Sequence, residues 1–322
     1  MNTPILLITF NRPQHTQKVL EAIIAAHPQD LYVFQDGARV NNMSDTEKCS
    51  EVRLVVESMV GSREITLHTN YSDKNLGCGP GPATAITWFF QNVESGIILE
   101  DDCVPHPDFF PYCEELLERY KDDERIGFVG GANYGYKVIS DASYSFSSGH
   151  HQTWGWASWR RVWNEFDYYL KDIDSKAFNR IIKKYYKSLR QREYWNRIFE
   201  VVKKDQIGNS CWDYQFYFSN WKSGRLALCP EVNLVQNVGD GIDATHTSNG
   251  SNELLHKNTH AILPLRHPNK IELDCGIDDF LMKNYIISNE YGWVGVCRIP
   301  HRLNNRLKKL LGHKGPWIKR KK

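Results

Sequence analysis

The chain has 322 residues, of which 41% are hydrophobic and 24% charged, which suits a large buried core and excludes global disorder. Residues 301–322 hold nine of the 40 basic residues and none of the 38 acidic ones, so the rest of the chain carries a net charge of −7. An acidic body argues against a nucleic-acid-binding face on the main domain.

Cysteine usage and the first residues bear on the cellular compartment. The eight cysteines are scattered, without the close pairs of a metal finger, which favours free thiols in a reducing compartment over a disulfide framework. The apolar run at residues 4–10 is too short for a signal peptide or a membrane span, and no other stretch reaches spanning length. We therefore expect a cytoplasmic protein.

Apolar strands and amphipathic helices alternate over the first hundred residues. The predicted strands are residues 5–10, 31–34, 65–68 and 96–99, and the predicted helices are residues 14–26, 45–60 and 82–93. This alternation predicts an α/β fold with a mostly parallel sheet covered on both faces.

The pattern changes after residue 105. We predict helices at residues 108–121, 178–187, 194–204 and 212–221, and strands at 126–130, 226–229 and 233–236. A tryptophan-rich loop is predicted over residues 150–163.

Polar side chains follow three of the predicted strands. They are Thr9, Asn11 and Arg12 after the first strand, Asp36 after the second, and Glu100, Asp101 and Asp102 after the fourth. Ligands of such sheets bind outside the carboxyl ends of the strands, so this edge is the predicted site. Taken singly, Asp36 is an ordinary turn residue, and Arg12 is either a surface charge or a clamp on a diphosphate.

The acidic run is the strongest of these signals. Carboxylates at the end of a buried strand need solvent, hydrogen-bond donors or cations to stay ionised, and clustered carboxylates raise each other's pKa. Mg²⁺ and Mn²⁺ prefer such oxygen ligands, and phosphates complete their shell. The alternative is a solvated turn with capping acids.

A glycine-rich loop at residues 75–82 opens the helix predicted at 82–93. It is not a Walker loop, because no Gly-Lys-Ser/Thr follows it. It is not a dinucleotide fingerprint either, because its glycine spacing differs and it does not follow the first strand. Its glycines, Gly77 among them, would let a ligand approach backbone N–H groups at a helix start, and the alternative is a plain flexible loop.

Motifs in order along most of the chain resemble those of the GT-A glycosyltransferases, and within them the N-acetylglucosaminyltransferase I type and related bacterial family-2-like enzymes. The most specific motif is residues 99–110, a Glu-Asp-Asp element followed closely by Pro-Asp-Phe-Phe. The other matching pieces are residues 4–12, 35–37, 154–156, 212–213, 230–231 and 237–246. The resemblance implies a Rossmann-like nucleotide-sugar-binding half (1–105), an acceptor-binding and catalytic half of the same domain (106–300) and a basic tail (301–322).

The resemblance also implies a role for each motif. The donor-binding residues would be Thr9, Asn11, Arg12, Asp36, Asn75, Gly77, Glu100, Asp101, Trp154, Gly155 and Trp156. Asp102 would bind Mn²⁺ or Mg²⁺ directly, His246 would approach the metal and the diphosphate, and Asp213 would be the catalytic base. The base motif reads Trp-Asp-Tyr-Gln and shares only its first two residues with the Trp-Asp-Asp-Trp form of the family. Asp213 could instead cap a helix, and the tryptophans could be core residues.

The activity implied is inverting, metal-dependent transfer of a sugar from a nucleotide sugar, with UDP favoured. The acceptor would be a hydroxyl of a glycan or lipid-linked glycan, as in bacterial surface polysaccharide synthesis. One alternative is a sugar-nucleotide nucleotidyltransferase, although residues 9–13 lack the glycine-rich, basic signature expected after the first strand. The other is a non-catalytic nucleotide- or carbohydrate-binding module, which would not need a carboxylate in the base position.

The last residues have a pattern of their own. Leu303, Leu307, Leu310 and Leu311 fall on one face of a helix, and lysines and arginines fill the others. Such a helix suits the anionic inner face of a plasma membrane, and the alternative is a soluble or disordered tail.

Overall fold

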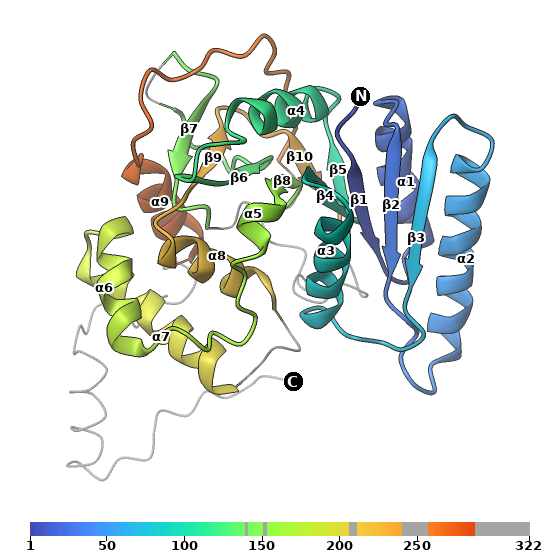
Figure 1. Ribbon diagram of the computed structural model, residues 1–322, viewed down its shortest axis with the longest axis horizontal. Helices are drawn as coiled ribbons and strands as arrows, with labels where there is room; N and C mark the ends of the chain where they lie inside the picture. The colour runs from blue at the N-terminus through green and yellow to red at the C-terminus, as the bar shows by residue number, and fades with distance from the viewer. Residues whose placement is uncertain (139–140, 151–152, 206–210, 240–256, 287–322) are drawn as a thin grey trace, which may run out of the picture. The chain divides into compact units, whose positions relative to one another are not determined.

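The computed structural model describes residues 1–138, 141–150, 153–205, 211–239 and 257–286 (Figure 1). The chain divides into one compact unit, Met1–Asp279, and a second, Phe280–Lys322. In the second unit the described residues include a π-helix at Met282–Ile286. The fold described below is that of the first unit.

The central element is an eight-stranded mixed sheet with the order β3-β2-β1-β4-β8-β6-β9-β7. Its strands are β1 (Ile5–Thr9), β2 (Asp30–Gln35), β3 (Thr66–Tyr71), β4 (Ser95–Glu100), β6 (Ile126–Gly130), β7 (Tyr144–Ser147), β8 (Trp156–Trp159) and β9 (Leu226–Pro230). Strands β3, β2, β1 and β4 are parallel, as are β6 and β9, whereas β8 and β7 pair antiparallel with their neighbours. This is the predicted α/β class, with a Rossmann-like half formed by the first four strands.

The helices of the described residues are α1 (Pro13–Ala25), α2 (Met43–Val60), α3 (Pro80–Asn92), α4 (Phe109–Arg119), α5 (Arg160–Trp163), α6 (Ser175–Tyr185), α7 (Leu189–Asp205), α8 (Asp213–Lys222) and α9 (Cys275–Leu281). Those of the first half cover both faces of its parallel strands (Figure 1). Helices α1 and α2 pack together on one face, and α3 lies on the other (Figure 1). Right-handed crossovers require this, because β1, β2 and β3 step one way along the sheet and β4 lies in the opposite direction.

The predicted loop at residues 150–163 is wrong, because it contains β8 and α5. The four residues of β8 are all buried, and the strand pairs with both β4 and β6. A strand buried on both faces shows no apolar–polar alternation, so sequence periodicity does not reveal it. Trp156 stacks on Trp212 with ring centroids 5.6 Å apart, which joins the sheet to the start of α8.

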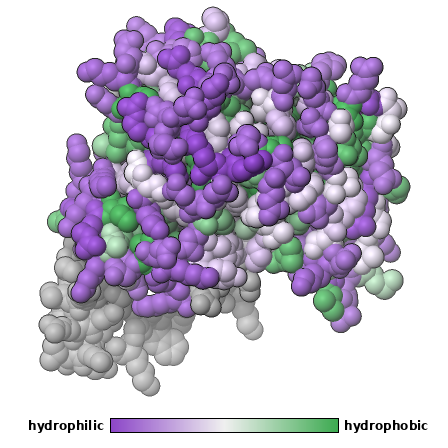
Figure 2. Space-filling model, viewed as in Figure 1, coloured by the Kyte–Doolittle hydropathy of each residue, from purple (hydrophilic) through white to green (hydrophobic). Residues whose placement is uncertain are grey.

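Aromatic side chains fill much of the interior. The largest fully buried side chains are all aromatic, and they include Trp156, Trp195 and Trp221. On the face shown in Figure 2, hydrophobic residues appear as separate patches among hydrophilic ones. The apolar residues of the sheet and helices are thus largely enclosed.

The seven cysteines among the described residues are free thiols. A search of the same residues finds no helix with both the length and the apolar character to cross a membrane.

Candidate functional site

The carboxyl ends of β1, β2 and β4 lie side by side. In the parallel register Ile8 pairs with Glu100, and Thr9 pairs with Gln35. The residues that follow these strands therefore meet at one edge of the sheet, as the sequence predicts.

Arg12 joins the loop after β1 to the acidic run. Its Nη1 lies 3.0 Å from Asp102 Oδ2, and its Nη2 donates to Asp101 Oδ1. Burial lowers the pKa of Arg12, but the charges of Asp101 and Asp102 outweigh it and raise that pKa above its usual value. Arg12 is therefore a fixed cation that neutralises the run in this structure, rather than a side chain aimed at an open ligand site.

The three acids differ in their surroundings. Asp101 is 2% exposed and also accepts the backbone N–H of Phe10 (3.3 Å). Burial, followed by the charges of Asp102 and Asp101, raises the pKa of Glu100 to about 8. A carboxyl group in this state binds a proton readily, and a cation placed beside it would favour its ionised form.

Asp102 contacts a segment from the second half of the chain. The side-chain amide of Asn237 lies 3.4 Å from its Oδ1, and the N–H of Val238 donates to its carbonyl oxygen (2.8 Å). This contact follows from the small sheet of β5 (Cys103–Pro105) and β10 (Val235–Asn237), which pair antiparallel. Neither strand was recognised with these bounds from the sequence, although residues 237–246 were expected to close over the site.

Among the described residues, no group of three or more His, Cys, Asp or Glu side chains converges to hold a metal ion by itself. Asp102 remains half-buried with a carboxylate at the sheet edge. Such a site fits an ion that uses one or two carboxylates and takes its remaining ligands from substrate phosphates and water. It does not fit a dedicated protein cage.

Two motifs far apart in the sequence, Asp36 and the glycine-rich loop, meet at the end of β2. Asp36 Oδ1 accepts the N–H groups of Gly37 (2.9 Å) and Leu76 (2.8 Å), and Oδ2 accepts from Gly77 N (3.0 Å) and the Asn75 amide (3.1 Å). Burial raises the pKa of Asp36, and the backbone N–H groups oppose that rise. Asp36 thus anchors the loop in this structure, which differs from the base-reading role that the resemblance implies.

Asp213 reaches the same edge from α8. The preceding residue, Trp212, stacks on Trp156, and Trp156 pairs in register with Ile98, two residues before Glu100, so Asp213 lies near the end of β4. Asp213 is the first residue of α8, and Trp212 occupies the N-cap position, which contradicts the alternative that Asp213 is the cap. The positive end of the helix dipole favours a charged carboxylate there.

Two other predicted donor residues make internal contacts. Thr9 is 2% exposed and donates to the carbonyl of Phe34 (3.0 Å). The Asn11 amide donates to Asp45 (2.7 Å), whose hydrogen bonds from Arg39 and Asn11 lower its pKa to about 2. Asp45 holds Asn11 in place, and the sequence did not predict this contact, because Asp45 has the pattern of an ordinary first-turn acid of a helix.

The tryptophan motif divides between core and surface. Trp156 is 1% exposed inside the aromatic core, so the structure contradicts its predicted role as a platform for a donor sugar. Trp154 is half-buried and meets the ring of Tyr134 edge-on (5.6 Å between centroids). Gly155 accepts the N–H of Gly131 (2.8 Å). His246 and the basic tail lie outside the described residues.

No family model matches the sequence, and no curated protein matches it. Among solved structures, the chain is similar to the 4-diphosphocytidyl-2C-methyl-D-erythritol synthase of Anaerococcus prevotii, with 9% identity, 54% of this chain and 79% of that one covered, and a TM-score of 0.34. It is also similar to the inositol-1-phosphate CTP transferase of T. maritima, with 8% identity, 53% of this chain and 74% of that one covered, and a TM-score of 0.32. A third similar structure is a UDP-glucose pyrophosphorylase complexed with UDP-glucose, with 10% identity, 46% of this chain and 63% of that one covered, and a TM-score of 0.28.

The names of these proteins describe nucleotidyl transfer rather than glycosyl transfer. They do not support the finer resemblance to the N-acetylglucosaminyltransferase I type. At these identities and TM-scores the similarity does not decide an activity.

Proposed function

We propose that this chain is a glycosyltransferase that moves a sugar from a nucleotide sugar to a hydroxyl group of an acceptor. One observation carries the proposal: Trp212, the residue before Asp213, stacks on Trp156, and Trp156 pairs in register with Ile98, two residues before Glu100. The packing thus brings Asp213 to the end of β4, although it is far from the acidic run in the sequence. A carboxylate beside a donor site can take the proton of an attacking hydroxyl as a general base.

The bonds, electrons and proton of the proposed transfer balance with the donor, the acceptor hydroxyl and Asp213. The acceptor oxygen forms a bond to the anomeric carbon, and the bond from that carbon to the phosphate oxygen breaks. The nucleoside diphosphate leaves with the electron pair, and the hydroxyl proton passes to Asp213. Attack opposite the leaving group inverts the configuration, as the resemblance implies.

Asp102 would hold a Mn²⁺ or Mg²⁺ ion that arrives with the donor, with His246 as a further ligand by resemblance. When bound, the ion neutralises charge that grows on the departing diphosphate. Arg12, which pairs with Asp101 and Asp102, carries a guanidinium suited to a diphosphate. We expect it to exchange its carboxylate partners for the donor when donor and ion bind together.

The donor is UDP-linked by resemblance, and the acceptor is a glycan or a lipid-linked glycan of a bacterial surface polysaccharide. Nucleotidyl transfer is the second candidate, and the structures above carry names of that class. Such enzymes need a glycine-rich, basic loop after the first strand to hold a triphosphate. Here β1 ends at Thr9 and α1 begins at Pro13, and the connection Phe10-Asn11-Arg12 contains no glycine.

A panel of nucleotide sugars with Mn²⁺ tests the proposal. We expect slow hydrolysis of one donor, abolished by EDTA. Asp213→Asn should bind that donor as the parent does and lose roughly a hundredfold or more of its turnover, while Asp122→Asn, an exposed acid elsewhere, should behave as the parent.

Release of pyrophosphate from a nucleoside triphosphate and a sugar 1-phosphate, without donor hydrolysis, would establish nucleotidyl transfer instead. Undiminished turnover in Asp213→Asn would remove Asp213 as the base. Turnover that survives EDTA would remove the metal from the mechanism.

A further inference from the structure

A cleft of about 1100 Å³ lies between the outer face of α3 and the segment that follows α5. One end reaches the carboxyl edge of the sheet, because its lining includes Pro80, the first residue of α3, and Asn70 of β3. Asn70 pairs in register with Phe34, two residues before Asp36. The cleft therefore reaches the carboxyl edge of the sheet on its β3 side.

The charged side chains of the cleft already have partners in the protein. The contacts are Lys222 with Asp172 (3.6 Å), Glu165 with Arg225 (2.6 Å), Asp167 with the N–H of Tyr169 (3.1 Å), and Lys171 over the ring of Tyr169 (5.3 Å). A ligand that fits this cleft therefore needs no net charge of its own.

What the cleft offers is aromatic faces among uncharged polar groups. The aromatic lining residues are Trp88, Phe166, Tyr168 and Tyr169, and the amide and hydroxyl residues include Asn70, Gln91, Asn164 and Thr84. Tyr169 is 61% exposed. The C–H face of a sugar ring packs on an aromatic ring, and its hydroxyl groups pair with amides, so this lining suits a neutral carbohydrate.

Tyr168 connects the cleft to the catalytic edge. Its hydroxyl is shielded from solvent and has no hydrogen-bond partner among the described residues. The ring of Tyr168 meets Phe166 edge-on (6.1 Å between centroids), and Phe166 stacks on Trp163 (4.2 Å). Trp163 in turn lies 6.2 Å from the ring of Trp212, the residue before Asp213. A shielded hydroxyl without a partner costs free energy, and a ligand hydroxyl that displaces the shielding groups at the wall of the cleft would recover it.

We propose that this cleft binds the neutral carbohydrate part of the acceptor and so brings one of its hydroxyl groups to Asp213. This inference rests on the proposed glycosyl transfer, and it adds the substrate class and the residues that bind it.

The test is binding of the full chain, without donor or metal, to an array that carries short neutral oligosaccharides beside sialylated and uronic-acid oligosaccharides. We expect binding to neutral glycans. Tyr169→Ala and Asn164→Ala, both at exposed positions, should each weaken it at least about tenfold. Tyr168→Phe, which removes only the shielded hydroxyl, should weaken it as well. Leu54→Ala, an exposed apolar residue of α2, is the matched control and should bind as the parent.

Binding to no neutral glycan, a preference for acidic glycans, or equal binding by the cleft variants and the parent would each overturn the proposal. The two proposals fail separately. Glycan binding through the cleft without hydrolysis of any nucleotide sugar refutes only the glycosyl transfer. Donor hydrolysis by a chain whose cleft variants bind glycans normally refutes only the cleft.

Discussion

At the scale of single residues, several side chains expected to face a ligand also hold the site together. Asp36 accepts hydrogen bonds from three backbone N–H groups, and Arg12 pairs with two acids. A buried carboxylate needs such donors to stay charged. Residue type and position predicted that these residues meet at the sheet edge, but not which of their atoms would already be occupied.

Gly155 is the residue where backbone geometry matters most in the tryptophan motif. Its φ is +65°, and a Cβ atom would lie 2.6 Å from Cγ2 of Val235. Gly155→Ala should lower the free energy of unfolding by about 2–4 kcal/mol, from left-handed strain plus a clash in the core. Gly224→Ala is the control, because φ is +75° there with nothing within 4 Å. It should cost only the strain, about 1–2 kcal/mol. If urea denaturation gives the two variants equal losses in the free energy of unfolding, the side chain of Val235 has moved to relieve the clash.

Asp278 should make stability depend on pH. It is 1% exposed and accepts from the N–H and hydroxyl of Ser148. Burial, with the charges of Asp279 and Asp274, raises its pKa from 3.8 to about 7. Between pH 4 and 7 the folded state holds a proton that the unfolded state has lost, so stability should fall as pH rises through this window, by about 4 kcal/mol.

Asp278→Asn keeps a group that accepts from the N–H of Ser148, and it should flatten that slope. Urea denaturation of parent and variant at pH 5 and pH 8 measures the difference. The same slope in both proteins would assign the pH dependence to other groups.

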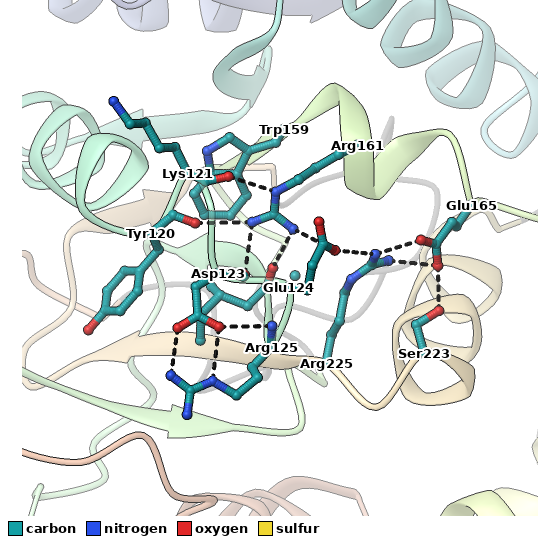
Figure 3. A network of polar contacts seen from close by, with 12 residues as sticks. Tyr120, Lys121, Asp123, Glu124, Arg125, Trp159, Arg161, Glu165, Ser223 and Arg225 are labelled. Carbon is teal, nitrogen blue, oxygen red and sulfur yellow. Dashed lines mark hydrogen bonds and ion pairs between the residues drawn. The ribbon is translucent and has the colours of Figure 1, made fainter.

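At the scale of elements, a polar network fastens the second half of the sheet to its helices. Figure 3 shows Arg161 of α5 and Arg225, which precedes β9, on either side of Glu124. Arg161 also donates to backbone carbonyls of the turn between α4 and β6, and Arg225 donates to Glu165. These bonds satisfy carbonyls at the end of α4 and fix three connections at once.

Replacing Arg225 tests the network. Its side chain is 4% exposed, so Arg225→Met should lower the free energy of unfolding by about 2–3 kcal/mol, less than for a fully buried pair because Glu124 and Glu165 can be rehydrated. Arg125→Met, at an exposed ion pair with Asp123 in the same network, is the control and should leave stability unchanged. Comparable losses in thermal denaturation would contradict the distinction between buried and exposed arginines.

At the scale of the whole molecule, charge is distributed unevenly along the sequence. Residues 301–322 carry nine positive charges and no negative ones, whereas the rest of the chain is acidic. Near an anionic membrane each such charge contributes about 1 kcal/mol. The tail therefore remains our candidate for a membrane contact.

Deleting residues 301–322 should abolish co-sedimentation with phosphatidylglycerol vesicles at low salt. Vesicles of phosphatidylcholine alone are the control, and neither protein should bind them. Unchanged sedimentation of the truncated chain with the anionic vesicles would show that the tail does not mediate membrane binding.

The sequence by itself determined the α/β class, most helices, and the three polar strand ends. These follow from local periodicity and from the rule that parallel strands place their carboxyl ends together. Strand β8, the β5–β10 pair and the burial of Trp156 were decided only by the tertiary structure. Short strands buried on both faces carry no alternation, and an aromatic residue suits a core as well as a binding surface. The placement of Asp213 near the end of β4, and the cleft along α3, likewise depend on long-range packing that no local pattern encodes.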